Sequence, residues 1–348
     1  MARHGRRRLS GGVTLRHVAV EAGVSLMTVS NVINDRFDLM SDDTRKRVEE
    51  AIDRLSYRPN LAARSLRSAR RLSVGMIVVD SSPAFLADPF TTHLVAGLSN
   101  YLNERGYVLA LQGVQHDAVA TATLLKSMRT DALCVFLSGS PSRRQDIIET
   151  VHNVNEPMIV FQERTALGTP DICSIRQDDR DGGRWLAEHL LERGARRLVF
   201  LVPRLVWPAF SARESGVRDV LKKSGTGAAL RRVTYQGDFF VATQEALARD
   251  IDRHGAPDAV IGGNDQIAIA AIKLLEDRQL RVPKDVAVTG FNAFGFRQYS
   301  SPVLTTVKSP AYEMGARGAE EVLMRLDTGR FADPEIVLPV EPLVGTST

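Results

Sequence analysis

Cysteine is nearly absent from this sequence, since only Cys134 and Cys173 occur among its 348 residues. One disulfide at most is possible, and the spacing of the pair fits neither a zinc site nor a redox pair. Long apolar runs are also missing. Stretches such as residues 133–137 are far shorter than the roughly 18–20 residues that cross a bilayer, and the basic start lacks the apolar part of a signal peptide. These absences predict a cytoplasmic protein without a metal or a cofactor.

Catalytic motifs are missing as well. The chain has no Gly-Lys-Ser/Thr phosphate loop, no Gly-x-Ser-x-Gly elbow, no His-Glu-x-x-His pair and no dinucleotide glycine pattern after a strand. A binding protein that is not an enzyme is the simpler interpretation. An enzyme such as a sugar kinase or a dehydrogenase is an alternative, which a turnover assay with nucleotides and sugars would test.

Charge is unevenly distributed along the chain. The first 71 residues carry 15 Lys and Arg against 8 Asp and Glu, a balance of +7, whereas the rest balances at −3. A basic domain joined to a slightly acidic one is typical of a nucleic-acid reader fused to a second domain. A solvated basic tail is the alternative, because the arginines at residues 6–8 bind phosphate without reading sequence.

The apolar pattern of residues 14–55 predicts three short helices. Thr14 caps the first, Gly23 ends it, Ser25 caps the second, and the third begins near Ser41. Their inward faces form one small core, consisting of Leu15, Val18, Ala19, Ala22, Val29, Val32, Ile33, Val48, Ala51, Ile52 and Leu55. Two short helices across a glycine turn are the DNA-binding helix-turn-helix, whose second helix lies in the major groove.

The outward residues of the second helix distinguish DNA binding from a helical hairpin that merely packs. They are Leu26, Met27, Ser30, Asn31 and Asn34. Large apolar side chains such as Leu26 and Met27 are out of place in water, but they suit thymine methyl groups while Asn31 reads an adenine edge. The pattern therefore favours DNA recognition.

The sequence SLMTVSNVIN at residues 25–34, followed by YRPN at 57–60 and ARSL at 63–66, closely resembles the LacI/GalR family of bacterial transcription regulators. The resemblance continues over nearly the whole chain. It implies that Leu26 and Met27 occupy the two main base-reading positions and that residues 60–68 form a hinge helix on the operator. Asn31 is a departure, since the family usually has a base-contacting arginine there.

Leu66 matches the family's leucine that wedges into the minor groove. A surface leucine in a linker is the alternative, but the surrounding arginines can supply the backbone contacts that offset unstacking of a base step. The DNA-binding residues expected on all these grounds are Thr14, Ser25, Leu26, Met27, Thr28, Ser30, Asn31, Asn34, Tyr57, Asn60, Ala63, Arg64, Leu66 and Arg67.

Beyond residue 71, short apolar runs alternate with helical patterns, which predicts parallel sheets covered by helices in two lobes. The first series contains residues 74–79, 91–105, 107–111, 118–128 and 132–137, and the second contains 198–202, 211–223, 233–236, 242–253, 259–261 and 286–290. Ligands of such folds bind at the carboxyl ends of the strands, so the cleft between the lobes is the predicted binding site.

This part resembles the periplasmic-binding-protein type I fold, in which a small effector closes two lobes. The residues that match its pocket motifs are Arg213, Asn264 and Asn292, with Phe239, Asp178 and Ser309 as weaker matches. Each has a plainer interpretation. Arg213 could form a surface ion pair, and Asn264 could simply cap the helix that begins at Asp265.

Two departures from the family concern the charge of the effector. Gln162 and Asn292 stand where related regulators commonly have aspartate, so Arg213 is predicted to be less compensated and to favour an acidic or phosphorylated sugar. The alternatives are that Glu163 supplies the charge through a one-residue shift, or that the amides bind neutral hydroxyls adequately.

The predicted fold is a small all-α helix-turn-helix domain joined to an α/β, Rossmann-like, two-lobed effector domain. Its parts are a disordered arm at 1–12, the helix-turn-helix domain at 13–58, a hinge helix and linker at 59–71, and an effector-binding and dimerisation domain at 72–348. The predicted function is a homodimeric, nucleoid-associated repressor that binds a pseudo-palindromic operator under control of a sugar or sugar acid. A sugar-transport binding protein is the alternative, but it needs a signal peptide and no DNA-binding domain.

Overall fold

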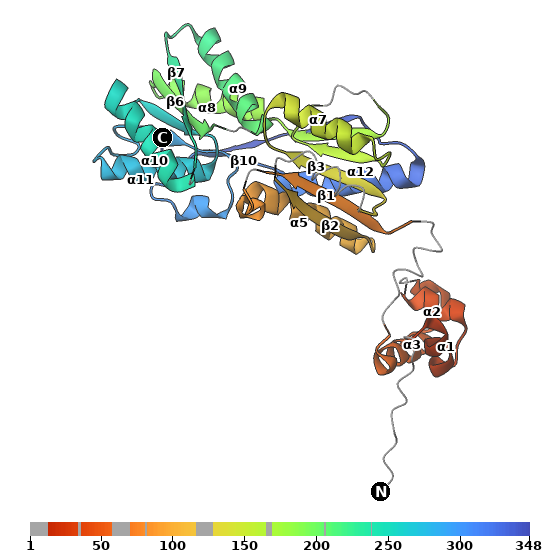
Figure 1. The fold of residues 1–348 in the computed structure, drawn as a ribbon. Helices are drawn as coiled ribbons and strands as arrows, with labels where there is room; N and C mark the ends of the chain where they lie inside the picture. The colour runs from red at the N-terminus through yellow and green to blue at the C-terminus, as the bar shows by residue number, and fades with distance from the viewer. Residues whose placement is uncertain are drawn as a thin grey trace. The chain divides into compact units, whose positions relative to one another are not determined.

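The computed structural model describes residues 13–33, 36–57, 70–80, 82–115, 128–164, 169–204, 207–237 and 239–348. The chain divides into two compact units between Leu72 and Ser73 (Figure 1). The first unit is helical and the second alternates strands and helices. The predicted fold class is therefore confirmed.

The described residues of the small unit form three helices and one short 3-10 turn, which are α1 (Leu15–Ala22), α2 (Leu26–Ile33), η1 (Phe37–Leu39) and α3 (Asp42–Leu55). Thr14 occupies the N-cap of α1, and Gly23 ends that helix with a φ of 65°. The Oγ of Ser25 accepts from the backbone N–H of Thr28 at 3.1 Å, and the Oγ of Ser41 accepts from that of Thr44 at 3.3 Å. Helix starts and stops thus lie where the capping residues predict them.

One apolar cluster holds the small unit together. Val18, Val29, Val48 and Ala51 are completely buried, and each of the three helices contributes at least one of them. A unit this small buries a limited share of its surface, so every large side chain in the cluster matters for stability.

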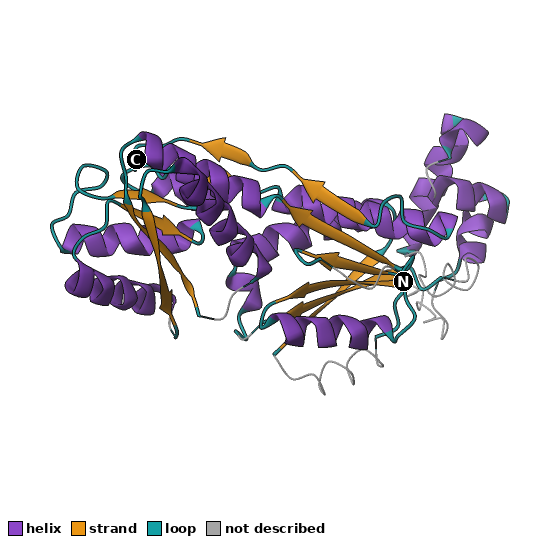
Figure 2. Ribbon diagram, turned by 90° about the horizontal axis from the view of Figure 1, so that it is seen from above, coloured by secondary structure: helices purple, strands orange, loops and turns teal. Residues whose placement is uncertain are grey.

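The first lobe of the large unit is a six-stranded parallel sheet in the order β11-β5-β4-β3-β1-β2. Its strands are β1 (Ser73–Val79), β2 (Val108–Val114), β3 (Ala132–Leu137), β4 (Met158–Phe161), β5 (Ile172–Gln177) and β11 (Glu335–Leu338). Helices α5 (Pro89–Glu104), α7 (Pro141–His152) and α12 (Ala311–Thr328) flank the sheet, together with the 3-10 turn η2 (Phe85–Ala87) (Figure 2). Strands β3 and β4 are buried at every position, as central parallel strands require.

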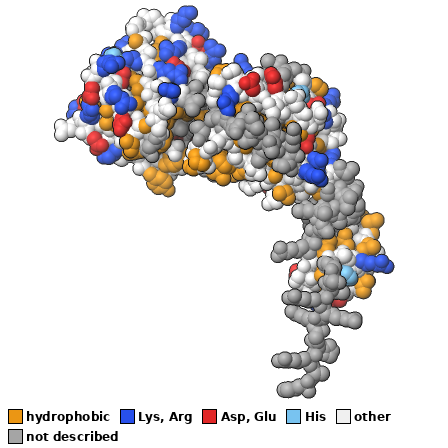
Figure 3. Space-filling model, viewed as in Figure 1, with side chains coloured by type: hydrophobic (Ala, Val, Ile, Leu, Met, Phe, Trp, Pro, Cys, Tyr) orange, Lys and Arg blue, Asp and Glu red, His pale blue; other side chains and the backbone are white. Residues whose placement is uncertain are grey.

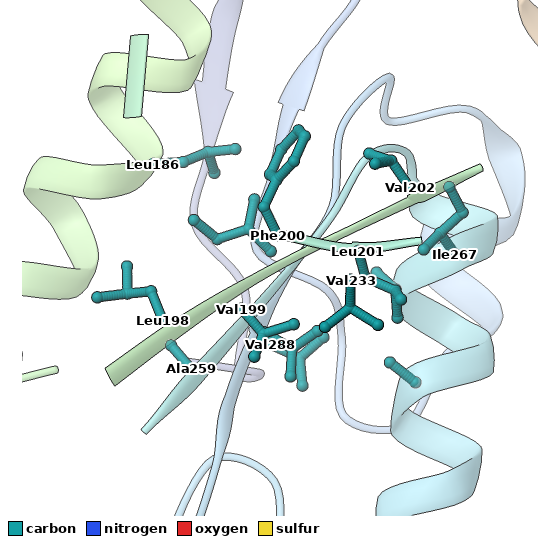
Figure 4. Close-up of a cluster of buried hydrophobic side chains, with 14 of the residues drawn as sticks. Leu186, Leu198, Val199, Phe200, Leu201, Val202, Val233, Ala259, Ile267 and Val288 are labelled. Atoms are coloured by element: carbon teal, nitrogen blue, oxygen red, sulfur yellow. The ribbon is translucent and has the colours of Figure 1, made fainter. Parts of the chain in front are cut away.

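The second lobe is a four-stranded parallel sheet in the order β7-β6-β8-β9. Its strands are β6 (Arg197–Pro203), β7 (Ala229–Tyr235), β8 (Ala259–Gly262) and β9 (Ala287–Thr289). Its helices are α8 (Asp179–Glu192), α9 (Pro208–Ser224), α10 (Phe239–His254), α11 (Asp265–Asp277) and the 3-10 helix η3 (Gly295–Tyr299). Leu186 of α8 and Ile267 of α11 reach the strand residues Phe200 and Leu201 in one apolar core (Figure 4).

The chain passes between the lobes three times. It leaves β5 for α8, returns through β10 (Thr306–Lys308) to α12, and passes from β11 to β12 (Glu341–Leu343), which pairs antiparallel with β10. Figure 1 shows β10 between the two lobes. Helices α7, α8 and α12 and strands β5 and β10 to β12 are additions to the predicted pattern. The predicted helix at 118–128 lies almost wholly outside the described residues.

Candidate functional site

Two large apolar side chains open helix α2 on the surface of the small unit. Leu26 is 51 % exposed and Met27 is 70 % exposed, whereas Val29 and Val32 of the same helix are buried in the core. Hydrophobic side chains reach the surface of this unit in the face shown in Figure 3. The first turn of this helix therefore carries apolar side chains that do not pack against their own unit.

Polar side chains surround this apolar pair. Thr14 and Ser25 are exposed, and Thr28, Ser30 and Asn31 are half-buried, so all five present atoms to the surface. The hydroxyl groups of Ser25 and Thr28 also form a hydrogen bond, with their oxygens 2.9 Å apart. Small hydrogen-bonding groups beside exposed apolar ones match the donors, acceptors and methyl groups of base edges.

Tyr57 differs from the prediction. Its side chain is buried in the core of the small unit, because the chain turns back onto the helices after α3. The ring therefore stabilises the fold and offers little surface to DNA. Several other predicted DNA-binding residues lie outside the described residues, namely Asn34, Asn60, Ala63, Arg64, Leu66 and Arg67, together with the rest of the predicted hinge helix.

A cavity of about 300 Å³ lies between the two lobes of the large unit, at the carboxyl ends of the strands. Five of the predicted effector-binding residues line it, namely Gln162, Arg213, Phe239, Asn264 and Asn292. Two do not. Asp178 caps α8 by accepting from the backbone N–H of Asp181 at 3.0 Å, and the buried hydroxyl of Ser309 donates to Oε1 of Gln177 at 2.6 Å.

Asn264 caps helix α11 and also lines the cavity. Its Oδ1 accepts from the backbone N–H of Ile267 at 2.9 Å, which fixes the start of α11. The two interpretations of this residue are compatible, since the first turn of a helix points its free N–H groups toward a ligand at the same edge.

Arg213 is held from several sides. Its Nε donates to Oδ1 of Asp179 at 2.8 Å, one terminal nitrogen donates to the carbonyl of Gly263 at 2.5 Å, and the other donates to Oδ1 of Asn292 at 3.2 Å. The guanidinium also lies 3.6 Å from the centre of the Phe291 ring. Burial lowers the pKa of Arg213 from its usual value, and the charge of Asp179 counteracts that shift.

Gly183 allows helix α8 to pack closely against the backbone of Arg213 on α9. A Cβ on Gly183 of α8 would lie 2.2 Å from the carbonyl oxygen of Arg213, which no other residue could accommodate without moving α8 away from α9. Close contact between these helices therefore fixes where the Arg213 side chain begins.

Gln162 follows β4 of the first lobe and binds Asp179, the carboxylate that pairs with Arg213. Its amide nitrogen donates to Oδ2 of Asp179 at 3.1 Å, and its Oε1 accepts from the backbone N–H of Gln177 at 3.1 Å. Gln162 has a φ of 60° and Asn292 a φ of 104°, which are left-handed values outside the range that most side chains favour. Such backbone strain is typical of ligand sites.

The predicted shortage of charge around Arg213 is wrong. Asp179 pairs with it at 2.8 Å, and the two side chains are 4 % and 3 % exposed. Glu163 is not the compensating residue, because it pairs with Arg144 of α7. The sequence could not show which aspartate pairs with Arg213, because Asp178 and Asp179 are adjacent and equally acidic. The position at which α8 starts decides which of the two carboxylates points into the protein.

An aromatic wall was not predicted from the sequence. The rings of Phe136 and Trp207 stack with their centres 4.2 Å apart, and those of Phe90 and Phe136 lie 5.3 Å apart. Phe210 and Tyr235 complete the wall beside Phe239. These aromatic residues all lie near the carboxyl ends of strands or at the starts of the following helices. Their position in the sequence pattern could therefore have indicated that they line the cavity.

Three carboxylates complete the electrostatics of the site. Asp80 and Asp88 line the cavity, and burial raises the pKa of Asp88 although hydrogen bonds from Thr91 oppose the shift. Burial raises the pKa of Asp265 at the start of α11 to about 7, while Thr306 donates to its Oδ1 at 2.6 Å and opposes that rise.

No helix among the described residues is both long and apolar enough to cross a membrane, and these residues contain no group of side chains arranged to hold a metal ion.

Comparison with known proteins agrees with this geometry. Residues 14–60 match the profile "Bacterial regulatory proteins, lacI family", and residues 187–348 match "Periplasmic binding protein-like domain". The transcriptional regulator CelR of Thermobifida fusca is 30 % identical over 340 residues, which cover 96 % of this chain and 98 % of that protein. The chain belongs to the LacI family.

Other LacI-family members give the same picture. The ribose operon repressor of Escherichia coli K12 is 29 % identical, with 90 % of this chain and 93 % of that protein covered. Among solved structures, the Lac repressor dimer bound to operator and the anti-inducer ONPF is 26 % identical with a TM-score of 0.74, covering 97 % of this chain and 99 % of that one. The CelR–cellobiose complex has a TM-score of 0.71 at 25 % identity, over 97 % and 100 % of the two chains. This chain is accordingly a DNA-binding transcription regulator.

Proposed function

We propose that this LacI-family regulator represses transcription as a homodimer on a pseudo-palindromic operator, and that a small hydroxylated ligand in the interlobe cavity controls its affinity for that operator. The observation that carries the DNA-binding part is the exposure of Leu26 and Met27 at the start of α2. Exposed apolar groups among Ser and Asn side chains suit a major groove and serve no purpose inside the small unit.

Symmetry and relatives support the dimer. A two-fold dimer presents two recognition helices to two half-sites, which is why such operators are palindromic. The related Lac repressor structure is described as a dimer bound to operator. We propose the same assembly here.

The cavity supports binding of a neutral, ring-shaped, hydroxylated ligand. Its aromatic wall suits the apolar faces of a sugar ring, and Gln162, Asn264 and Asn292 supply both donors and acceptors for hydroxyl groups. The related structures contain cellobiose in one case and ribose in another. An acidic or phosphorylated sugar is the less favoured alternative, because Asp80 and Asp88 repel it and Asp179 already satisfies Arg213.

Operator binding is tested by selecting the preferred DNA from a random library with the full chain and measuring its affinity by fluorescence anisotropy. We expect a pseudo-palindromic site whose affinity falls steeply with salt, because phosphate contacts release counterions. A single asymmetric half-site bound by a monomer would contradict the proposal.

Base reading by Asn31 is tested by repeating the selection with Asn31→Arg. Asparagine favours adenine and arginine favours guanine, each pair being worth roughly 1–3 kcal/mol. The selected operator should therefore change at one position of each half-site. An unchanged operator would show that Asn31 does not touch a base.

Effector control is tested by adding sugars to the repressor–operator complex and by calorimetry with the free protein. Cellobiose and ribose serve as neutral probes, with cellobionic acid and ribose 5-phosphate as their acidic counterparts. We expect a neutral sugar to bind and to change operator affinity. Binding restricted to the acidic members would revive the alternative.

A further inference from the structure

Asp179 is a buried carboxylate at the centre of the effector site that does not itself line the cavity. Its Oδ1 accepts from Arg213 at 2.8 Å and from the side-chain amide of Gln177 at 2.7 Å. Its Oδ2 accepts from Gln162 at 3.1 Å. Both oxygens are thus engaged, and two of the three donors, Arg213 and Gln162, face the ligand space.

These partners come from different parts of the fold. Gln162 follows β4 of the first lobe, Arg213 lies on α9 of the second lobe, and Gln177 ends β5 where the chain crosses between them. Gln177 in turn accepts from Ser309, which follows β10 on the return crossing. Asp179 therefore links the ligand-facing side chains to two of the interlobe connections.

The charge beside the Arg213 guanidinium depends on Asp179. Arg213 is the lone cationic side chain in the described lining, and Asp179 neutralises it from behind. The remaining charged lining residues are the acids Asp80 and Asp88. A ligand in the cavity meets a site that is negative overall, despite the arginine at its base.

We propose that Asp179 is the positioning residue that sets the charge selectivity of the effector site. It orients Arg213 and Gln162 and cancels the positive charge, so that Arg213 donates hydrogen bonds to neutral groups and does not capture an anion. This inference rests on the proposed role of the cavity as the effector site and specifies which ligands it rejects.

The test replaces Asp179 by its uncharged isostere and uses inorganic phosphate as the probe. Asp179→Asn keeps an acceptor for Arg213 but leaves the buried guanidinium without a carboxylate in direct contact. The full-length variant should gain thermal stability with phosphate relative to chloride at equal ionic strength. The expected rise in Tm is roughly 2–4 °C at phosphate concentrations several times the dissociation constant. The wild-type protein should show no such rise.

Asp250→Asn is the matched control. Asp250 pairs with Arg231 at 2.8 Å, is nearly as buried, and lies away from the cavity. This variant should respond to phosphate as the wild type does. The inference is overturned if Asp179→Asn gains no more than this control, or if the wild type already gains stability that Arg213→Gln abolishes.

A charge swap keeps the test decisive if Asp179→Asn folds poorly. Asn292 lies 3.2 Å from Arg213, so Asn292→Asp combined with Asp179→Asn returns a carboxylate to the guanidinium from another side. The double variant should fold and lose the phosphate response, whereas the single variant should recover its circular dichroism on addition of phosphate. A phosphate response that persists in the swap would overturn the inference.

This experiment uses neither DNA nor sugar, so its outcome is separate from that of the proposed function. If phosphate has no effect on Asp179→Asn while operator binding still responds to a sugar, the inference about Asp179 alone fails. If the phosphate response is seen but no operator is selected, the proposed function alone fails.

Discussion

The two units of this protein depart from the usual distribution of side chains in opposite ways. The small unit carries large apolar groups on its surface, with Met27 70 % exposed, whereas the large unit buries charges such as Arg213 and Asp179. Exposed apolar area and buried charge are both unfavourable unless a partner is supplied. Under the proposed function, DNA is the partner of the exposed apolar groups of the small unit. The large unit pairs Arg213 with Asp179 in its own interior.

The proposed function accounts for this difference. A duplex presents a rigid groove with methyl groups already in place, so the protein needs an exposed surface of matching shape. A small ligand has to be surrounded, so its site is a cavity whose polar groups are already oriented by one another. The buried pair of Arg213 and Asp179 is such a preorganised group.

The largest effect is expected from removing one member of that pair. Arg213→Ala leaves the Asp179 carboxylate buried without its cation, which should lower the free energy of unfolding by about 3–5 kcal/mol. Urea unfolding followed by tryptophan fluorescence measures this, because Trp185 and Trp207 are the two tryptophans of the chain and both lie in the large unit.

Arg281→Ala is the control for that measurement. Arg281 also pairs with an aspartate at 2.8 Å, but its side chain is 62 % exposed. Solvent screens such pairs, so the loss should be much smaller than that of Arg213→Ala. Equal losses in the two variants would show that burial of charge is not what distinguishes the site.

A second, smaller effect should appear in the pH dependence of stability. The pKa of Asp265 is about 7 in the folded protein and close to 4 in an unfolded chain, so the folded state holds a proton that the unfolded state has released between these values. Its contribution to wild-type stability is thus present below about pH 4 and is lost as the pH rises to about 7.

Asp265→Asn removes this contribution but can still accept from Thr306. From pH 4 to pH 8 the variant should gain on the order of 2–4 kcal/mol relative to the wild type, with no further change above pH 8. Urea titrations at several pH values measure the difference. Parallel profiles for the two proteins would contradict the assigned pKa.

The sequence predicted the lobes but not the internal pairing of their charges. Alternating strand and helix patterns predict which edge of the sheets carries the site, and Gln162, Arg213, Asn264 and Asn292 all line the cavity there. The partner of Arg213 depends on the rotation of α8, since Asp178 and Asp179 are adjacent and equally acidic. Tertiary packing of α8 on α9 decides that rotation, and local pattern carries no information about it.

In the small unit almost everything described was predictable. Its structure is determined by local signals, such as the Ser25 and Ser41 caps and the left-handed Gly23, and by one apolar stripe per helix. Tyr57 is the exception. An aromatic residue just after a helix has no periodic partner that would indicate whether it faces the core or the solvent.

The exposed pair of α2 should affect binding without affecting stability. Leu26→Ala and Met27→Ala should each weaken operator binding by about 1–2 kcal/mol, the value of the methylene groups no longer buried against DNA. Stability of the small unit, followed by hydrogen exchange in the full chain, should change by less than about 0.5 kcal/mol. Val29→Ala is the opposite case, because its side chain is completely buried and its loss should accelerate exchange throughout the unit.

The smallest effect concerns two helix caps within the small unit. Ser25 caps α2 and Ser41 caps α3 through equivalent hydrogen bonds, so Ser25→Ala and Ser41→Ala should each cost about 1 kcal/mol of helix stability. Of these two serines, Ser25 caps the helix start that carries Leu26 and Met27, so its loss should also weaken operator binding by a similar amount. Ser25→Gly should recover most of both losses, because glycine at this position costs only a few tenths of a kcal/mol. Hydrogen exchange of α2 and α3 together with anisotropy on the selected operator measures these effects. If Ser41→Ala weakened operator binding as much as Ser25→Ala, the capped start of α2 would have no special part in DNA recognition.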